Sequence, residues 1–331
     1  MVSEDKMIKS LIIALVAFVV AAACGIFLIP LLHRLKFGQE IREEGPKWHQ
    51  TKSGTPTMGG FIFIIAVIVA VVLGNFVVGT EDYLKQVKGV TAITLAAIGF
   101  GAIGFVDDYI KVILKRNLGL RAAQKFALQL LVSLLFSVWM VSGGIVDTSI
   151  SIPFTNFSIN LHYVIYIPLI ILVMVAATNS VNLTDGLDGL AATITIVVAL
   201  FYCIVSNIAG KTPVVILSSA LFGGLAGFLI YNRYPAKVFM GDTGSLFLGG
   251  AISAMAIYMQ DPILLIIIGF VYVMESLSVI IQVAWFKKTG KRIFKMSPIH
   301  HHFEMCGWSE VKIVTVFSLV TAILCVIGFF A

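Results

Sequence analysis

Long apolar runs separated by short polar breaks dominate the chain. A run of about 17 to 25 apolar residues can cross the roughly 30 Å hydrocarbon core of a bilayer as a helix. The sequence predicts ten such segments, with approximate limits Ser10–Leu32, Gly59–Val78, Val90–Val106, Phe126–Val141, Leu161–Thr178, Leu190–Asn207, Pro213–Ile230, Leu246–Met259, Pro262–Phe286 and Val311–Phe330. The fourth and eighth are the shortest, so hydropathy defines their ends least well.

The composition agrees with this pattern. Apolar residues make up 59% of the chain and charged residues 12%, with a mean hydropathy of +1.01. Soluble domains carry about 25% charged residues, so an ordinary soluble protein is excluded. We expect an all-α integral membrane protein whose residues 1–331 form one domain. Between two spans, residues 147–160 alternate apolar and polar side chains around Pro153, which predicts a short β-hairpin outside the membrane.

The basic residues predict how the chain is oriented. Of its 23 Lys and Arg residues, 18 fall in or beside one set of alternate loops and five in the other. Because cytoplasmic loops carry more Lys and Arg, the first set is predicted to face the cytosol, and both termini and the hairpin to be external. These basic residues are spread among loops and accompanied by acidic ones. Anionic lipid or phosphate substrates therefore fit better than nucleic acid.

Asp107 and Asp108 stand side by side where the third apolar segment ends. A charge at a bilayer centre costs about 2.5 to 3.5 kcal/mol, so an adjacent pair near the membrane indicates a function. Lys111 follows Asp107 at helical spacing, and an ion pair between them is the simplest interpretation. That pair does not account for Asp108. Its repulsion from Asp107 favours a shared divalent cation or substrate chemistry.

A second acidic motif has Asn182, Asp185 and Asp188 spaced three apart, which places them along one side of a helical turn. Gly186 and Gly189 allow a ligand to approach the backbone, although they would equally permit tight helix packing. Aspartates are costly in a packing motif, so we interpret this segment as a binding loop.

Two glycine-containing loops precede apolar spans. Residues 52–60 have two interpretations. They form a loop that binds an anion through Lys52 and Thr57, or they mark the start of a helix with Thr57 as its N-cap. Residues 232–245 place Asp242 between Gly241 and Gly244, which suits a metal-bound phosphate, with a helix cap as the alternative.

The last polar loop contains His300, His301 and His302 followed by Glu304. Consecutive histidines rarely point at one metal ion, so contact with phosphate or sugar is the better interpretation. Glu275 lies inside the ninth apolar span, where an unpaired carboxylate is unfavourable. It faces a polar cavity or makes a local pairing between helices, and the sequence leaves both interpretations open.

Taken together, five segments resemble the polyprenyl-phosphate N-acetylhexosamine-1-phosphate transferase family. They are GTPTMGG at 54–60, DDYIK at 107–111, NLTDGLDGL at 182–190, PAKVFMGDTGS at 235–245 and PIHHHFE at 298–304. Relatives that use UDP-N-acetylglucosamine share the acidic motifs. The HHHFE segment and Gly307-Trp308, however, are similar to the phospho-N-acetylmuramoyl-pentapeptide branch. Phe247 departs from the family, in which a smaller residue is expected.

The resemblance implies a ten-helix enzyme of the bacterial cytoplasmic membrane that is usually a homodimer and requires Mg²⁺. It would transfer phospho-MurNAc-pentapeptide from UDP-MurNAc-pentapeptide to undecaprenyl phosphate, giving lipid I and UMP for peptidoglycan synthesis. A cytosolic active site agrees with the distribution of Lys and Arg. The alternatives are a related UDP-N-acetylhexosamine-1-phosphate transferase and, less well supported, a membrane transporter or flippase. Transporters usually bind substrate near the midplane between repeats, and no repeat is evident in this sequence.

The same resemblance implies residue roles. Asp242 would ligate Mg²⁺, Asp107 and Asp108 would bind the lipid phosphate, and Lys111 and Lys125 would offset charge. His301 completes the predicted catalytic set. The predicted substrate-binding residues are Lys52, Thr57, Asn179, Asn182, Asp185, Asp188, Asn232, Phe239, Gly241, Ser245, His300 and His302. Direct attack by the lipid phosphate, with Asp107 as base where that phosphate is protonated, is the preferred route. A covalent aspartyl-phosphate is the alternative.

Overall fold

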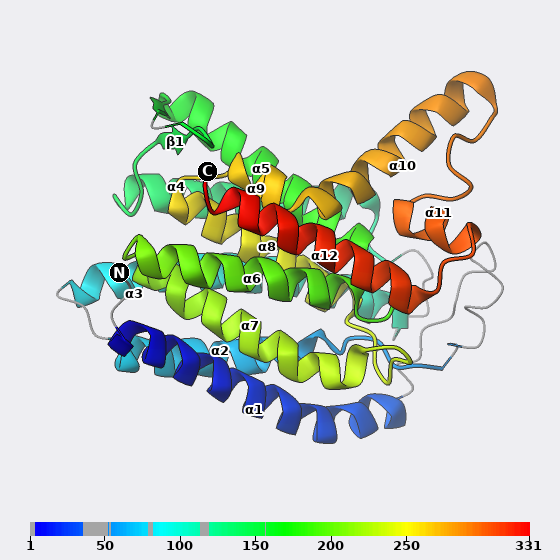
Figure 1. The fold of residues 1–331 in the computed structure, drawn as a ribbon, viewed down its shortest axis with the longest axis horizontal. Helices are drawn as coiled ribbons and strands as arrows, with labels where there is room; N and C mark the ends of the chain where they lie inside the picture. Colours follow the sequence, from blue (N-terminus) through cyan, green and yellow to red (C-terminus); the bar gives the residue numbers. More distant parts are fainter. Residues whose placement is uncertain (1–3, 36–51, 53, 79–81, 113–118, 156) are drawn as a thin grey trace.

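The computed structural model describes residues 4–35, 52, 54–78, 82–112, 119–155 and 157–331. Over these residues the chain forms twelve helices and one two-stranded sheet (Figure 1). The elements are α1 (Glu4–Arg34), α2 (Gly60–Val77), α3 (Tyr83–Val112), α4 (Ala122–Ser142), β1 (Ser149–Ser151), β2 (Ser158–Asn160), α5 (Tyr163–Thr184), α6 (Leu190–Ile208), α7 (Thr212–Asn232), α8 (Gly241–Met259), α9 (Leu264–Ile268), α10 (Phe270–Thr289), α11 (Ile299–Met305) and α12 (Glu310–Gly328).

Every predicted apolar span contains helix, so the all-α multi-pass prediction is confirmed. In the described residues, nine helices are long and apolar enough to cross a membrane. The remaining predicted span corresponds to α8, whose first turn includes Gly241 and Asp242 and is therefore more polar. The predicted limits are less accurate. α4 begins at Ala122 and not Phe126, and α8 at Gly241 and not Leu246, because both helices start inside polar motifs.

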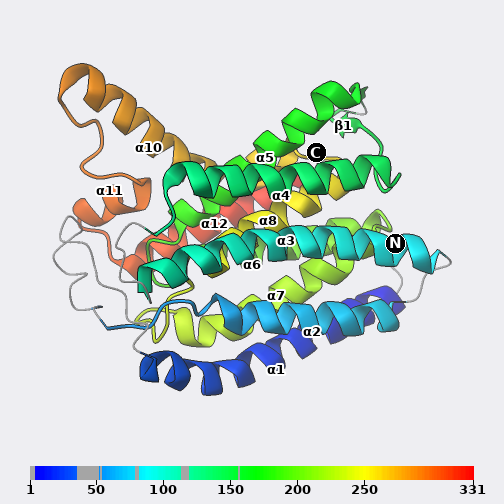
Figure 2. The ribbon, with the colours of Figure 1, turned by 180° about the vertical axis from the view of Figure 1, so that it is seen from behind.

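The ninth predicted span is not one helix. It divides at Gly269, which lies between α9 and α10 and whose N–H donates to the carbonyl of Leu265, closing the last turn of α9. Figures 1 and 2 show that α10 leans away from the rest of the bundle on the side where α11 lies.

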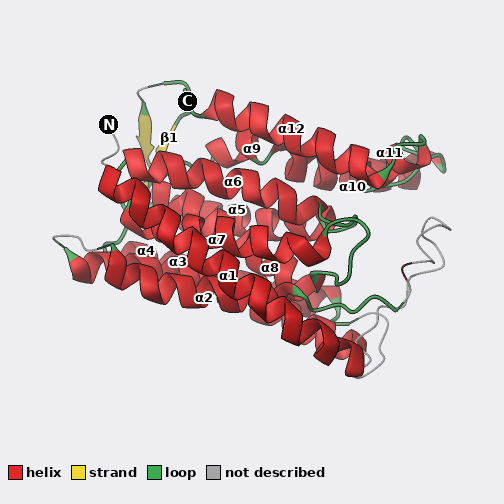
Figure 3. Ribbon diagram, turned by 60° about the horizontal axis from the view of Figure 1, so that its bottom comes forward, coloured by secondary structure: helices red, strands yellow, loops and turns green. Residues whose placement is uncertain are grey.

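α8 lies in the middle of the bundle. Its residues from Thr243 to Tyr258 are all buried, and α2, α3, α5, α6 and α7 pack against it. The outer helices differ: within its most apolar stretch α7 is 72% buried, whereas α1, α4, α10 and α12 are each 28% buried. Their outward surfaces carry large apolar side chains such as Phe27 and Leu131, as a lipid-facing surface requires. Figure 3 shows the helices of the bundle from another side.

Small residues let α3 and α8 approach closely, which is how helices associate where lipid removes the hydrophobic driving force. A Cβ at Gly104 would lie 2.0 Å from the carbonyl oxygen of Asp242. A Cβ at Gly101 would lie 3.2 Å from the Cβ of Phe247. The ring of Phe247 is fully buried and packs edge-on against that of Phe63. The large residue at 247 therefore fits because its neighbour on α3 has no side chain.

The two ends of the bundle differ. β1 and β2 pair antiparallel with Ser149 opposite Asn160, which confirms the predicted hairpin. Gln260, which follows α8, donates through its Nε2 to Ser149 Oγ at 2.7 Å and anchors the hairpin. Figure 1 shows that α1 begins and α12 ends at this end, whereas α11 and the polar motif loops lie at the other. We call these the hairpin end and the motif end.

Candidate active site

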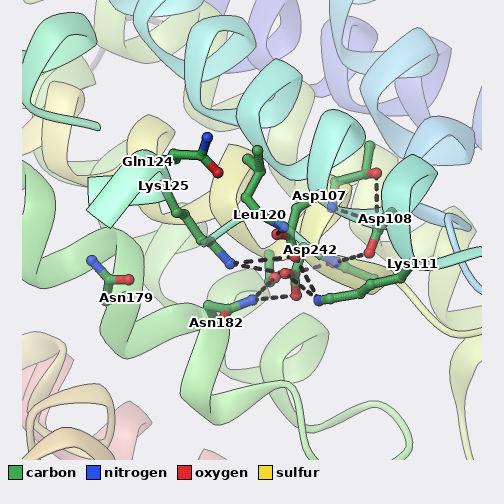
Figure 4. A network of polar contacts seen from close by, with 12 residues as sticks. Asp107, Asp108, Lys111, Leu120, Gln124, Lys125, Asn179, Asn182 and Asp242 are labelled. Carbon is green, nitrogen blue, oxygen red and sulfur yellow. Dashed lines mark hydrogen bonds and ion pairs between the residues drawn. The ribbon is translucent and has the colours of Figure 1, made fainter. Parts of the chain in front are cut away.

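Asp242, in the first turn of α8, is the centre of a polar cluster at the motif end. Its Oδ2 accepts hydrogen bonds from Lys111 Nζ and Lys125 Nζ, both at 2.8 Å. Its Oδ1 accepts one from Asn182 Nδ2, also at 2.8 Å (Figure 4). The three donors come from α3, α4 and α5 respectively. Motifs more than a hundred residues apart in the sequence therefore meet at one carboxylate, and we call this group the Asp242 cluster.

Asp107 joins the cluster from α3. Its Oδ2 lies 2.6 Å from Lys111 Nζ, which confirms the ion pair expected from their spacing, and 3.9 Å from Lys125 Nζ. Its Oδ1 accepts a hydrogen bond from the backbone N–H of Leu120 at 2.8 Å. The side chain of Asp242 is 17% exposed and that of Asp107 only 3%. Asp242 is therefore the carboxylate that a ligand reaches more easily.

Asp108 has a different set of contacts from its neighbour. Its Oδ2 accepts from the backbone N–H of Thr243 at 2.9 Å and from the Thr243 hydroxyl at 2.7 Å, and its Oδ1 accepts from the N–H of Asp242 at 3.1 Å. The first N–H groups of a helix lack partners within it, and a carboxylate there also interacts favourably with the helix dipole. Asp108 thus caps α8 from a neighbouring helix and fixes Asp242. This contact could not be predicted from the sequence.

Two cap interpretations from the sequence are wrong. α2 is preceded by Gly59 as its N-cap, so Thr57 does not cap it, and α8 is preceded by Met240, so Asp242 lies inside the first turn. Thr57 is buried instead beside Gly241. Gly241 has φ +73°, and a Cβ there would lie 2.6 Å from Asp108 Oδ2. Any other residue would be strained and would push Asp108 off the start of α8.

The loops before α2 and α8 pair with each other through their backbones. The N–H of Phe239 donates to the carbonyl of Pro56, and the N–H of Gly59 donates back to Phe239, both at 2.8 Å. Asn232 Nδ2 donates to Val238, whereas the buried Asn232 Oδ1 has no hydrogen-bond partner among the described residues. Ser245 accepts from Asn182 at 2.8 Å. The structure thus gathers these predicted substrate-binding residues around the start of α8.

Asp185 lies just after α5 and close to this cluster. Burial and, to a smaller extent, the nearby carboxylates of Asp242, Asp108 and Asp188 together raise the pKa of its carboxyl group to about 8. Its local sequence resembles that of Asp188, yet no described residue donates a hydrogen bond to the Asp185 side chain. The raised pKa favours the protonated form of Asp185 near neutral pH, and in that form the carboxyl group can donate a hydrogen bond.

A second group joins Lys52 to two carboxylates. Lys52 Nζ lies 2.8 Å from Asp188 Oδ1 and 2.6 Å from Glu310 Oε2. Burial would lower the pKa of Lys52, but these two carboxylates outweigh it and raise the pKa. The other oxygen of Asp188 accepts from the N–H of Ala236 at 2.9 Å. Glu310 was not predicted, because an acidic residue in the first turn of α12 has the pattern of an ordinary helix start.

An open hollow of about 340 Å³ borders this second group. Its lining residues are Tyr234, Glu304, Gly307, Trp308, Ser309, Glu310 and Val311. Lys52 Nζ lies 5.8 Å from the ring centroid of Tyr234, and Lys312 Nζ lies 4.2 Å from that of Trp308. The hollow therefore has aromatic walls with cationic and anionic groups beside them.

The three histidines point to different partners. His300 Nδ1 lies 3.0 Å from Glu275 Oε2, and His301 Nδ1 lies 2.6 Å from Glu304 Oε2. His302 Nδ1 accepts a hydrogen bond from the N–H of Lys295 at 3.1 Å. The partner of Glu275, which the sequence left open, is therefore a histidine of the neighbouring short helix.

Asn179 is the one predicted residue on α5 that lies apart from Asp242. Its Nδ2 donates to Gln129 Oε1 at 2.9 Å, so it connects α5 to α4. Within the described residues, no group of three or more His, Cys, Asp or Glu side chains is placed to hold a metal ion. The predicted magnesium ligand Asp242 stays a prediction.

Comparison with known proteins shows the family of this chain. Residues 90–260 match the glycosyl transferase family 4 model, and residues 52–64 match phospho-N-acetylmuramoyl-pentapeptide-transferase signature 1. The phospho-N-acetylmuramoyl-pentapeptide-transferase of Clostridium botulinum strain Eklund 17B is 52% identical over 96% of this chain and 94% of its own length. The corresponding enzyme of Clostridium kluyveri strain ATCC 8527 is 51% identical over 98% of this chain and 99% of its own length. That of Clostridium perfringens strain 13 is 49% identical over 98% of each. The chain therefore belongs to the phospho-N-acetylmuramoyl-pentapeptide transferase family.

Proposed function

We propose that this chain transfers phospho-MurNAc-pentapeptide from UDP-MurNAc-pentapeptide to undecaprenyl phosphate, producing lipid I and UMP. The observation that carries this proposal is the convergence of Lys111, Lys125 and Asn182 on Asp242 at one end of a membrane bundle. A lipid phosphate and a nucleotide diphosphate repel each other. Buried cationic groups at the membrane boundary are what such a pair of substrates requires.

The reaction needs little covalent chemistry from the protein. An oxygen of the lipid phosphate attacks the phosphorus attached to the sugar, and the bond from that phosphorus to the bridging oxygen breaks, with its electrons leaving on UMP. Lys111 contacts both Asp107 and Asp242, and Lys125 lies beside them, so both ammonium groups can turn toward substrate oxygens. Asp107 would accept the proton where the lipid phosphate carries one.

Direct attack is better supported than an aspartyl-phosphate intermediate. Both oxygens of Asp108 accept hydrogen bonds from the start of α8, and Asp107 is held by Leu120 and Lys111. A carboxylate that attacked phosphorus would give up these bonds, and Asp108 would uncap α8. Their arrangement suits fixing and neutralising substrates rather than forming a covalent bond.

The donor set of the Asp242 cluster suits Mg²⁺ better than a metal that needs a closed protein site. Mg²⁺ usually takes one or two carboxylates and completes its shell with water and substrate phosphates. Asp242 would hold the ion, with Asp107 next to it. The ion would neutralise the diphosphate and the departing UMP.

The remaining contacts suit the nucleotide sugar. Phe239 is half-buried beside Asn232, so its ring is available to stack on a base, and protonated Asp185 is a donor. Lys52, held by Asp188, brings a cation to the same loops. Because 18 of the 23 basic residues fall, by sequence, in or beside the loops that carry these motifs, we propose that this end faces the cytosol at a bacterial inner membrane, where UDP-MurNAc-pentapeptide would be. From the family resemblance we also propose that two copies of this chain form a homodimer.

UMP release by the purified protein in lipid vesicles tests the proposal. Release from UDP-MurNAc-pentapeptide should require both undecaprenyl phosphate and Mg²⁺. Faster release from UDP-N-acetylglucosamine would favour the related transferase branch. Movement of lipid or solute across the vesicle membrane without UMP release would favour a transporter or flippase.

A further inference from the structure

Glu275 and His300 form a pair that is completely shielded from solvent, away from the Asp242 cluster. Both side chains have 0% exposure, and His300 Nδ1 lies 3.0 Å from Glu275 Oε2. The backbone N–H of His300 points at the same oxygen at 3.5 Å. A carboxylate buried in an apolar helix is unfavourable without a partner. The pair therefore explains why α10 tolerates Glu275, but not why the chain has an acid at this position.

The contact fixes where the ring of His300 carries its proton. A carboxylate at Glu275 accepts hydrogen bonds and does not donate them, so it favours the tautomer of His300 with the proton on Nδ1. Nε2 is then the nitrogen left for another contact. Within the described residues, both His300 Nε2 and Glu275 Oε1 are buried without a hydrogen-bond partner. Carboxylates hold metal-binding histidines in one tautomer and orientation in the same way.

The free nitrogen of His300 faces the loop between α5 and α6. A Cβ at Gly186 would lie 2.2 Å from His300 Nε2 and 2.6 Å from His300 Cε1, so the ring rests directly on the backbone of Gly186. Asp185 precedes Gly186, and Asp188, two residues later, contacts Lys52. The imidazole of His300 thus supports the short loop that carries two predicted nucleotide-sugar contacts.

The next histidine has the same relation to an acid. The ring of His301 lies on that of His300 with centroids 4.1 Å apart, and its Nδ1 lies 2.6 Å from Glu304 Oε2. Both rings therefore turn Nδ1 toward a carboxylate. Because His301 rests on His300, a change in the orientation of the buried ring would also move the more exposed one.

We propose that Glu275 is a positioning residue that keeps the proton of His300 on Nδ1, and through His300 holds the loop 185–189 in the shape that receives the nucleotide sugar. This inference deepens the proposed function and rests on it. Glu275 itself touches neither substrate. Its effect is transmitted by the ring of His300 and the backbone of Gly186.

Glu275→Gln tests the role, because a glutamine has the same size and can either donate to or accept from Nδ1, so it no longer selects one tautomer. We expect the KM for UDP-MurNAc-pentapeptide to rise about tenfold, with the KM for undecaprenyl phosphate changed by less than about twofold. The matched control is Ser276→Ala. It removes a 2.7 Å hydrogen bond to Ser180 on α5, next to Glu275, without touching His300.

A purely structural role gives a different result. Glu275→Gln would then lower the unfolding temperature and the fraction of active protein, as Ser276→Ala does, and leave both KM values unchanged. That outcome would overturn the proposal. Gly186→Ala provides a second variant, since its methyl group would press on His300 Nε2. It should raise the same KM, and the double variant should show less than the product of the two single effects, because both act through one ring.

Nitrogen-15 NMR of histidine-labelled protein in nanodiscs tests the proton position without turnover. The chain has six histidines, so His300 can be assigned by substitution. Wild type should show a protonated Nδ1, and Glu275→Gln a mixture of tautomers. An unchanged His300 signal in active Glu275→Gln protein would reject the positioning role alone. The expected His300 signals in a wild-type protein that releases no UMP would reject the proposed function and leave the Glu275–His300 coupling intact.

Discussion

Each end of the bundle contains a partly buried aspartate, but the two side chains have different hydrogen-bond partners. At the motif end, Asp242 accepts hydrogen bonds from Lys111, Lys125 and Asn182. At the hairpin end, Asp261 Oδ1 is buried without a partner among the described residues, and burial raises the pKa of this carboxyl group to about 7. Donors from three helices favour the charged form of Asp242, whereas burial favours the protonated form of Asp261. Convergent donors, rather than burial of an acid, therefore distinguish a site for anionic substrates.

Asp242→Asn should cause the largest loss. It removes the charge that holds Lys111 and Lys125 in place and the carboxylate that would bind Mg²⁺. We expect the initial rate of UMP release to fall about a thousandfold or more, as for loss of a central electrostatic group. Asp261→Asn is the matched control and should keep the wild-type rate within about twofold. Normal Mg²⁺-dependent turnover by Asp242→Asn would show that the Asp242 carboxylate has no role in the reaction.

Lys125→Met should have the next largest effect. Lys125 comes from α4 and is the cation of the cluster with the smaller exposure, 18% against 33% for Lys111. Its loss leaves Lys111 and Asn182 on Asp242, so we expect kcat to fall about a hundredfold. Rates measured with both substrates saturating check this. An unchanged kcat with a higher KM would mean that Lys125 binds substrate without acting on the transition state.

Lys52→Met should act mainly on binding. Lys52 joins Asp188 and Glu310 outside the Asp242 cluster, so the KM for UDP-MurNAc-pentapeptide should rise about tenfold with kcat nearly constant. Lys312→Met is the control, since Lys312 lies over the ring of Trp308, which also lines the hollow. An equal effect of the two variants would show that general positive charge matters and not the contact with Asp188.

Asp261→Asn should have the smallest effect, and on stability alone. Because the pKa of Asp261 is raised to about 7 in the folded protein, the folded state binds the proton more tightly than the unfolded state. Stability is therefore lost as pH rises from about 4 to about 7. The unfolding temperature of wild type should fall between pH 5 and pH 8 more than that of Asp261→Asn. Parallel curves for the two proteins would show that Asp261 is ionised throughout.

Hydropathy and spacing predicted the spans, the hairpin and the pairing of Asp107 with Lys111, because these depend on residues close in sequence. They failed where a helix starts inside a polar motif, as α8 does at Gly241. They also failed at Gly269, where one apolar run becomes two helices. An apolar sequence of constant hydropathy carries no mark of a break whose position is set by packing.

The contacts of the site itself depend on tertiary structure. The sequence named Asp108 and Glu275 as acids that needed an explanation. The partners of these acids are the first N–H groups of α8 and a histidine 25 residues away in α11. Neither partner follows a periodic pattern, and Glu310 looked like part of a helix start. Sequence identified the reactive groups, and only the fold shows which of them hold the others in place.

Binding of Mn²⁺, a paramagnetic substitute for Mg²⁺, is the most direct measurement of the difference between the two ends. Electron paramagnetic resonance of the protein in nanodiscs, with UDP-MurNAc-pentapeptide present, counts the bound ions. Wild type and Asp261→Asn should bind the ion with equal affinity, and Asp242→Asn should lose it. Undiminished binding by Asp242→Asn, or its loss in Asp261→Asn, would contradict the assignment of the Asp242 cluster as the reaction centre.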